Sequence, residues 1–81
     1  MKKVYDENLF IIGVQVKKLR KRKDYTQEGL AAALGISPMT LSRIENGTIA
    51  MNIQILLKMS EILEVSAEEI LCIKKSEDEE K

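Results

Sequence analysis

The short segment Gly35-Ile36-Ser37-Pro38 constrains the fold of this chain most, because it ends one helix and begins the next. Glycine is the residue that most readily adopts the left-handed conformation after the last turn of a helix. A serine followed by proline is typical of a helix start, since the hydroxyl caps the free N–H groups and proline suits the first helical position. Two short helices must therefore meet here at a tight turn.

The two helices on either side of this turn are both expected to be short. Thr26 is placed to cap the first helix, which ends at Gly35 after two to three turns, and Asn46-Gly47 is expected to stop the second. Apolar residues at helical spacing predict the buried positions of the two helices to be Leu30, Ala31, Leu34, Leu41 and Ile44.

A longer amphipathic helix is expected before this pair. Its apolar stripe is formed by Tyr5, Leu9, Ile12, Val16 and Leu19, and it ends in the basic run Lys17–Lys23. Phe10 and Val14 point away from that stripe, so the only phenylalanine is expected to be exposed. Cations in the last turns also favour the negative end of the helix dipole, so the basic run has a structural explanation besides a functional one.

Two more helices are expected after the pair. Asn52 is placed to cap the first of them, and Ser66 and Glu69 have the spacing of a capping box at the start of the second, which carries Ile70 and Leu71. The main buried stripe of the first is expected at Ile53, Leu56, Met59 and Leu63, widened by Ile55, Leu57 and Ile62. No strand pattern competes, so the fold class is all-α with five helices. We expect an N-terminal segment at 1–8, one domain at 9–73, and an acidic mobile tail at 74–81.

The charge of this chain is segregated along the sequence. The whole chain has 13 basic and 13 acidic residues. The part up to Tyr25 is basic, whereas the rest is acidic and includes the run Glu77–Glu80. The net charge of zero therefore does not exclude a nucleic-acid partner, because the basic groups are concentrated in one half.

Several classes of function are disfavoured by composition. There is no histidine and only one cysteine, Cys72, so neither a Cys/His zinc site nor an internal disulfide is expected, and no metal or cofactor is predicted. Cys72 is interpreted as a small core or edge residue. No catalytic residues and no small-molecule site are predicted, and no apolar run is long enough to span a membrane. We expect a cytoplasmic protein.

The arrangement of two short helices around a glycine turn is typical of DNA-reading helix-turn-helix proteins. The sequence resembles the phage repressor/Cro-like, or XRE-type, family. The resemblance is carried by 26–31 (TQEGLA), 34–37 (LGIS) and 41–47 (LSRIENG), and extends to 19–20 (LR), 56–58 (LLK), Leu63, 65–66 (VS) and 69–71 (EIL). It implies a compact five-helix lambda-repressor-like domain that binds double-stranded DNA through the second helix of the pair.

The resemblance also implies roles for individual residues. Those expected to face the bases of the major groove are Ser37, Pro38, Met39, Thr40, Ser42 and Arg43, with Ser42 nearer the edge. Those expected to meet phosphates are Gln27, Lys17, Arg20, Lys21, Lys23 and Asn46. Arg20 and Glu45 match a partly buried salt bridge. Arg43 is the side chain best suited to reading guanine.

This chain also departs from the family pattern. Thr48-Ile49-Ala50-Met51 stands where basic residues and a proline are common, so the basic run is expected to supply phosphate contacts instead. Glu64 stands where a glycine often ends the fourth helix, so that helix must end differently or continue.

We therefore expect a sequence-specific transcriptional regulator, in particular a repressor, acting as a homodimer on a two-fold operator. Its dimer surface is expected either on the last helix with the end of the fourth, or on the N-terminal segment. Two alternatives remain open. One is an antitoxin that also binds its own promoter, and the other is an adaptor that uses the fold without reading DNA.

Overall fold

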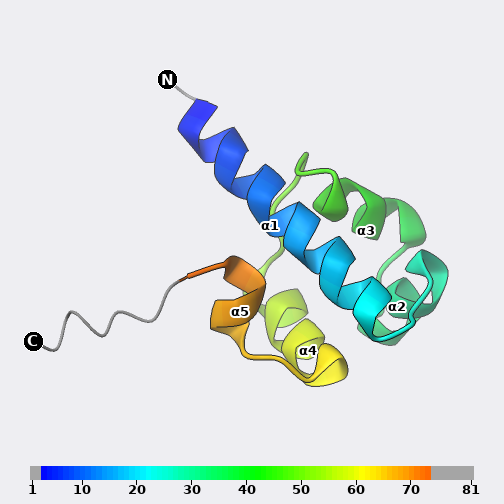
Figure 1. Ribbon diagram of the computed structural model, residues 1–81. Helices are drawn as coiled ribbons and strands as arrows, with labels where there is room; N and C mark the ends of the chain where they lie inside the picture. The colour runs from blue at the N-terminus through cyan, green and yellow to red at the C-terminus, as the bar shows by residue number, and fades with distance from the viewer. Residues whose placement is uncertain (1–2, 74–81) are drawn as a thin grey trace, which may run out of the picture.

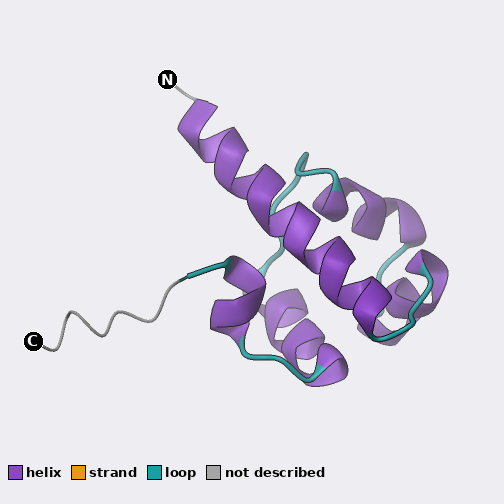
Figure 2. Ribbon diagram, in the orientation of Figure 1, coloured by secondary structure: helices purple, strands orange, loops and turns teal. Residues whose placement is uncertain are grey.

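The computed structural model describes residues 3–73, which form five α-helices (Figures 1 and 2). The helices are α1 (Lys3–Arg22), α2 (Gln27–Leu34), α3 (Pro38–Glu45), α4 (Ile53–Leu63) and α5 (Ala67–Leu71). The described part of the chain contains no strand, and the expected all-α, five-helix class is confirmed. The side chain of Tyr5 and the acidic tail at 74–81 lie outside the described residues.

The ends of the helices follow the local signals in the sequence. Thr26, Ser37, Asn52 and Ser66 each accept a hydrogen bond from the backbone N–H three residues later, and Gly35 adopts the left-handed conformation with φ of 77°. Of the expected capping box, the contact made by Ser66 is present. The carboxylate of Glu69 lies instead 3.5 Å from Arg22, on the neighbouring helix.

α1 is the long element against which the rest of the fold is arranged. Figure 1 shows it crossing the molecule, with α2 and α3 on one side and α4 and α5 on the other. It begins at Lys3 and continues without a break through residue 8, where the sequence analysis places the end of a separate segment. The core contains Val16 and Leu19 from α1 together with Leu30, Ala31, Leu34, Leu41, Leu56, Met59, Leu63 and Ile70.

The buried face of α4 differs from the one expected. Leu56, Met59 and Leu63 are buried as expected, but Ile53 is 64% exposed and Leu57 is 57% exposed. The stripe is rotated toward Ile55 and Ile62, which are half-buried and pack against the core. The predictions that Ile53 and Leu57 lie on the buried stripe are therefore wrong, because α4 turns both side chains toward solvent.

Two helices end on non-glycine residues in the left-handed conformation. Glu64 ends α4 with φ of 59°, which answers how the helix stops without a glycine. Cys72 ends α5 with φ of 61° and is exposed, so of the two places expected for it, core or edge, it occupies the edge. A left-handed conformation costs a non-glycine residue about 1–2 kcal/mol.

Candidate nucleic-acid interface

The outer face of α3 is the part of the helix pair that is free to meet a ligand. Leu41, Ile44 and Glu45 face inward and are buried. On the opposite side, Met39 is 61% exposed, Arg43 is exposed and Ser42 is half-buried. These three positions are spaced so that they share one face of the helix. The structure therefore presents these three side chains together on the outer face of α3.

The first turn of α3 is held by its own side chains. The Ser37 hydroxyl accepts a hydrogen bond from the backbone N–H of Thr40 at 3.0 Å, and the two hydroxyls lie 2.9 Å apart. Pro38 occupies the first helical position, where its missing N–H is tolerated. Ser37 and Thr40 thus use part of their hydrogen-bonding capacity to cap the helix, whereas the side chains of Met39 and Arg43 take no part in the cap.

A buried ion pair joins α1 to the end of α3. The Nε atom of Arg20 donates to one carboxylate oxygen of Glu45 at 2.6 Å, and an Nη atom donates to the other at 3.1 Å. The other Nη atom of Arg20 donates to the backbone oxygen of Tyr25 at 3.0 Å. The two side chains are only 9% and 2% exposed. The predicted pair is confirmed, and this two-point geometry fixes both side chains.

Gln27, at the start of α2, also contacts this pair. Its amide nitrogen donates to Glu45 at 3.1 Å, so one carboxylate links α1, α2 and α3. Arg20 and Gln27 were both expected to bind phosphates, but these donors form hydrogen bonds within the protein. Since Gln27 is only half-buried, part of its side chain still faces outward.

The backbone N–H groups at the start of the loop after α3 are hydrogen-bonded within the protein. Those of Asn46, Gly47 and Thr48 donate to the carbonyl oxygens of Ser42, Ile44 and Arg43, at 2.9 to 3.1 Å. These backbone N–H groups are therefore not available to bind a phosphate. The exposed side chain of Asn46 is the part of this loop left for such a contact.

The basic run divides into paired and solvent-facing cations. Besides the Arg20–Glu45 pair, Arg22 lies 3.5 Å from Glu69 and Lys23 lies 2.9 Å from Glu64. The remaining cations of the run, Lys17, Lys18 and Lys21, are exposed. Of the four cations expected to bind phosphates, two, Arg20 and Lys23, thus form ion pairs with glutamates of the protein itself.

The exposed lysines lie on two different sides of α1. Lys17 and Lys21 follow Gly13 at intervals of four residues, and Gly13 is the residue of α1 that meets the end of α3. Lys18 instead lies on the side of Gln15, whose amide donates to the backbone oxygen of Glu69 in α5. Lys17 and Lys21 are therefore the lysines that flank the α3 side of the molecule.

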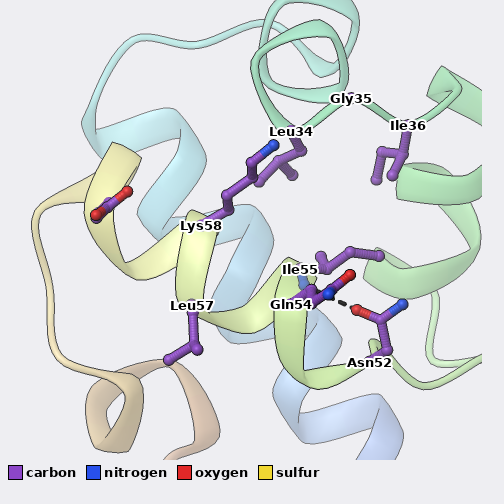
Figure 3. A pocket seen from close by; sticks show the side chains of 9 residues that line it. Leu34, Gly35, Ile36, Asn52, Gln54, Ile55, Leu57 and Lys58 are labelled. Carbon is purple, nitrogen blue, oxygen red and sulfur yellow. Dashed lines mark hydrogen bonds between the residues drawn. The ribbon is translucent and has the colours of Figure 1, made fainter.

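An open cleft of about 560 Å³ lies between the turn of the helix pair and α4 (Figure 3). Leu34, Gly35 and Ile36 form the wall on the side of the turn. The polar residues along it are Asn52, Gln54, Lys58 and Glu61, and all four are exposed. A specific small-molecule site usually has a few buried polar groups that orient its ligand. The polar residues of this cleft are not buried in that way.

Gly13 is a residue that the sequence analysis missed. It lies against the backbone of Ile44 and Glu45 at the end of α3. The available signal was a glycine within a strongly helical pattern, which generally has a packing or functional reason. Because its neighbours are apolar, the segment was interpreted as an ordinary amphipathic helix and the glycine was not singled out.

The model of a protein family described as Helix-turn-helix matches residues 16–70, which include all the contacts just described except those of Gly13 and Gln15. The chain belongs to this XRE-type helix-turn-helix family. Members of the family that resemble the chain in sequence are transcriptional regulators and not enzymes. The protein is accordingly a transcriptional regulator with a helix-turn-helix DNA-binding fold.

Two curated relatives illustrate the similarity. The uncharacterized HTH-type transcriptional regulator YazB of Bacillus subtilis is 42% identical over 60 residues, which cover 74% of this chain and 87% of that protein. The HTH-type transcriptional regulator RamB of Mycobacterium tuberculosis is 34% identical over 56 residues, which cover 69% of this chain but only 12% of RamB. The similarity to RamB thus concerns a small part of that protein.

Solved structures of the family have the same fold. The restriction-modification controller protein C.AhdI of Aeromonas hydrophila superimposes with a TM-score of 0.75 at 25% identity, over 79% of this chain and 97% of that one. The clp gene regulator ClgR of Corynebacterium glutamicum gives a TM-score of 0.76 at 26% identity, over 82% of this chain and 70% of that one. Within residues 3–73, no helix combines the length and the apolar character needed to cross a bilayer.

Proposed function

We propose that the protein is a sequence-specific repressor that places α3 in the major groove of an operator. The observation that carries this proposal is the exposed outer face of α3, opposite its buried side, with Arg43 at its centre. An arginine can donate two hydrogen bonds to guanine O6 and N7, a contact worth about 1–3 kcal/mol of discrimination. Met39 offers an apolar contact to a thymine methyl group, and Ser37, Pro38, Thr40 and Ser42 border them.

The phosphate contacts are assigned mainly to the α3 side of α1. Lys17 and Lys21 are exposed there and are the strongest candidates. Asn46 and the outward part of Gln27 flank α3 at its end and at the start of α2. Arg20 and Lys23 are weaker candidates, because each is engaged by a glutamate of the protein. We place this regulator in the cytoplasm, because the relatives it resembles are transcriptional regulators of bacteria.

The protein is proposed to bind as a homodimer through an apolar face formed by Ile11, Ile49, Ile53 and Ile73. All four are exposed, from 36% to 64%. They surround two adjoining hollows that share Ile12 and Leu71 in their walls. The other lining residues are apolar except for Asn8, Asn52 and Cys72, so a second copy can meet this face without like-charge repulsion.

Selection of bound sites from random double-stranded DNA tests the proposed function. We expect enrichment of two inverted half-sites whose centres are separated by about 10–10.5 base pairs, one helical turn, or a multiple of it. Enrichment of a single, asymmetric site would contradict the dimer. Failure to enrich any site, together with binding that does not depend on salt, would contradict DNA reading altogether and favour the adaptor alternative.

The proposed dimer face has a separate test by size-exclusion chromatography with light scattering. The wild-type chain is expected at twice the 9.2 kDa of one copy at tens of micromolar. Ile53→Glu should give the monomer, because it places a charge in an apolar interface. Phe10→Glu is the matched control, since Phe10 is 57% exposed on another side of α1. Dissociation by Phe10→Glu alone would move the interface to that side.

A further inference from the structure

Gly13 lies where α1 crosses the carboxyl end of α3. A Cβ atom at position 13 would lie 2.5 Å from the carbonyl oxygens of both Ile44 and Glu45. Ordinary carbon–oxygen contacts are about 3.3–3.6 Å, so any other residue would force the two helices apart. The backbones of α1 and α3 therefore touch directly at this glycine.

A second backbone contact joins α1 to the loop after α3. A Cβ atom on Gly47 would lie 2.7 Å from the Cα atom of Phe10 and 2.9 Å from its nitrogen. This contact is about one turn before Gly13 along α1. The end of α3 is thus held against α1 at two points, and at both points the obstacle to a side chain is rigid backbone.

The Arg20–Glu45 pair supplies a third point on the same side of α1. It lies two turns beyond Gly13, and its two hydrogen bonds fix the direction in which Glu45 projects. The three contacts span about 15 Å of α1, from Phe10 to Arg20. The glycine contacts set the distance between the two helices, and the ion pair sets the rotation of α3 about its axis.

We propose that Gly13 is a positioning residue that sets how far α3 projects from the body of the protein toward the groove. The proposal rests on the proposed function of α3 as the DNA-reading helix. A binding constellation has to be held within about 0.5 Å of its productive geometry. A methyl group at position 13 would move the end of α3 by about 1 Å, the difference between the contact at Gly13 and an ordinary one.

The variant Gly13→Ala tests this contact, and Gly29→Ala is its control. Gly29 is also a helical glycine, but its Cβ atom would meet only side-chain atoms, of Thr26 and Tyr25. Alanine forms helix better than glycine, so without a close contact both variants should melt at a higher temperature than the wild type. We expect Gly13→Ala to melt lower and Gly29→Ala not to do so. A raised melting temperature for Gly13→Ala would overturn the proposal.

A local loss of stability is distinguished from repositioning by amide NMR spectra. If Gly13 positions α3, Gly13→Ala should shift the resonances of Met39 and Thr40, at the far end of α3. Changes confined to the residues adjoining the contact, such as Ile44 and Glu45, would overturn the proposal. The spectra are recorded without DNA, so their outcome does not depend on the proposed function.

DNA binding is compared at a temperature where the variant is folded. The preference of Gly13→Ala for the selected site over random DNA should fall at least about five-fold, whereas its affinity for random DNA should change less than about two-fold. An unchanged preference would overturn the positioning role. If the wild-type chain has no preference, the proposed function fails and the NMR result alone decides the role of Gly13.

If Gly13→Ala does not fold, hydrogen exchange on the wild-type chain tests whether α1 and the end of α3 are held together. The amides of α1 between Val14 and Arg20 and those of α3 between Leu41 and Glu45 should open with the same free energy and the same dependence on denaturant. Exchange of the α3 amides through an opening that leaves α1 protected would overturn the proposal.

Discussion

Glu45 is the residue on which three helices depend. Its carboxylate is almost fully buried and accepts hydrogen bonds from Arg20 and Gln27. A buried ion pair of this kind gains little over apolar packing, but removing one partner leaves the other charge buried without compensation. The pair as a whole therefore adds little stability, but the loss of either partner alone is expected to destabilise the fold.

The variant Glu45→Ala should lower the free energy of unfolding by about 3 kcal/mol, because it strands the Arg20 guanidinium in the interior. Thermal and urea denaturation followed by circular dichroism measure this change. Glu61→Ala removes an exposed carboxylate from α4 and is expected to have a small effect. A melting temperature of Glu45→Ala equal to that of Glu61→Ala would refute the structural role of the pair.

At the scale of the helices, the local sequence was sufficient to predict where the four helices after α1 begin. The side chains of Thr26, Ser37 and Asn52 each cap the helix that follows, as their position before an apolar periodic segment indicated. Capping depends on atoms within four residues, so neighbouring sequence decides it.

The orientation of α4 could not be predicted in the same way. Periodicity alone placed Ile53 and Leu57 on the buried stripe, whereas the structure leaves both exposed and packs only Ile55 and Ile62 beside it against the core. Which of two overlapping apolar stripes is buried depends on where α2 and α5 pack, and this is a property of the tertiary structure. The close contact at Gly13 was missed for the same reason, since it involves residues about thirty positions apart. By contrast, the buried Arg20–Glu45 pair was predicted only through the family resemblance.

The end of α4 offers a test of helix termination. Glu64 adopts the left-handed conformation there, and its exposed pairing with Lys23 contributes little in water. The variant Glu64→Gly should therefore raise the free energy of unfolding by about 1 kcal/mol. Glu64→Ala is the matched control, because it removes the same ion pair but keeps the strain. If both variants have the same stability by urea denaturation, strain at this helix end is not significant.

At the scale of the whole molecule, the zero net charge hides an arrangement that limits the DNA-binding surface. Arg22 and Lys23 are paired with glutamates that follow α4 or lie in α5, and Arg20 is buried. Among the cations of the basic run, Lys17 and Lys21 are those left exposed beside α3. We expect electrostatic attraction to DNA to come from this narrow side and not from the whole basic run.

The salt dependence of binding to random DNA measures this division. Lys21→Ala should reduce the slope of log K against log salt by about 0.9 per protomer, the loss of one phosphate contact. Lys18→Ala removes an equal charge from the α5 side of the same helix and should leave the slope unchanged. Equal changes in the two variants would show that the lysines act through net charge and not through their placement.

The central claim is that α3 reads bases through Arg43. The most direct measurement compares wild type and Arg43→Ala on the selected operator, on operators altered at one base pair at a time, and on random DNA. We predict that Arg43→Ala loses discrimination at one base pair per half-site, by about 1–3 kcal/mol, with little change on random DNA or in melting temperature. An equal loss of affinity on operator and random DNA would contradict this claim. It would show that Arg43 contacts the DNA backbone and that α3 does not read bases through this side chain.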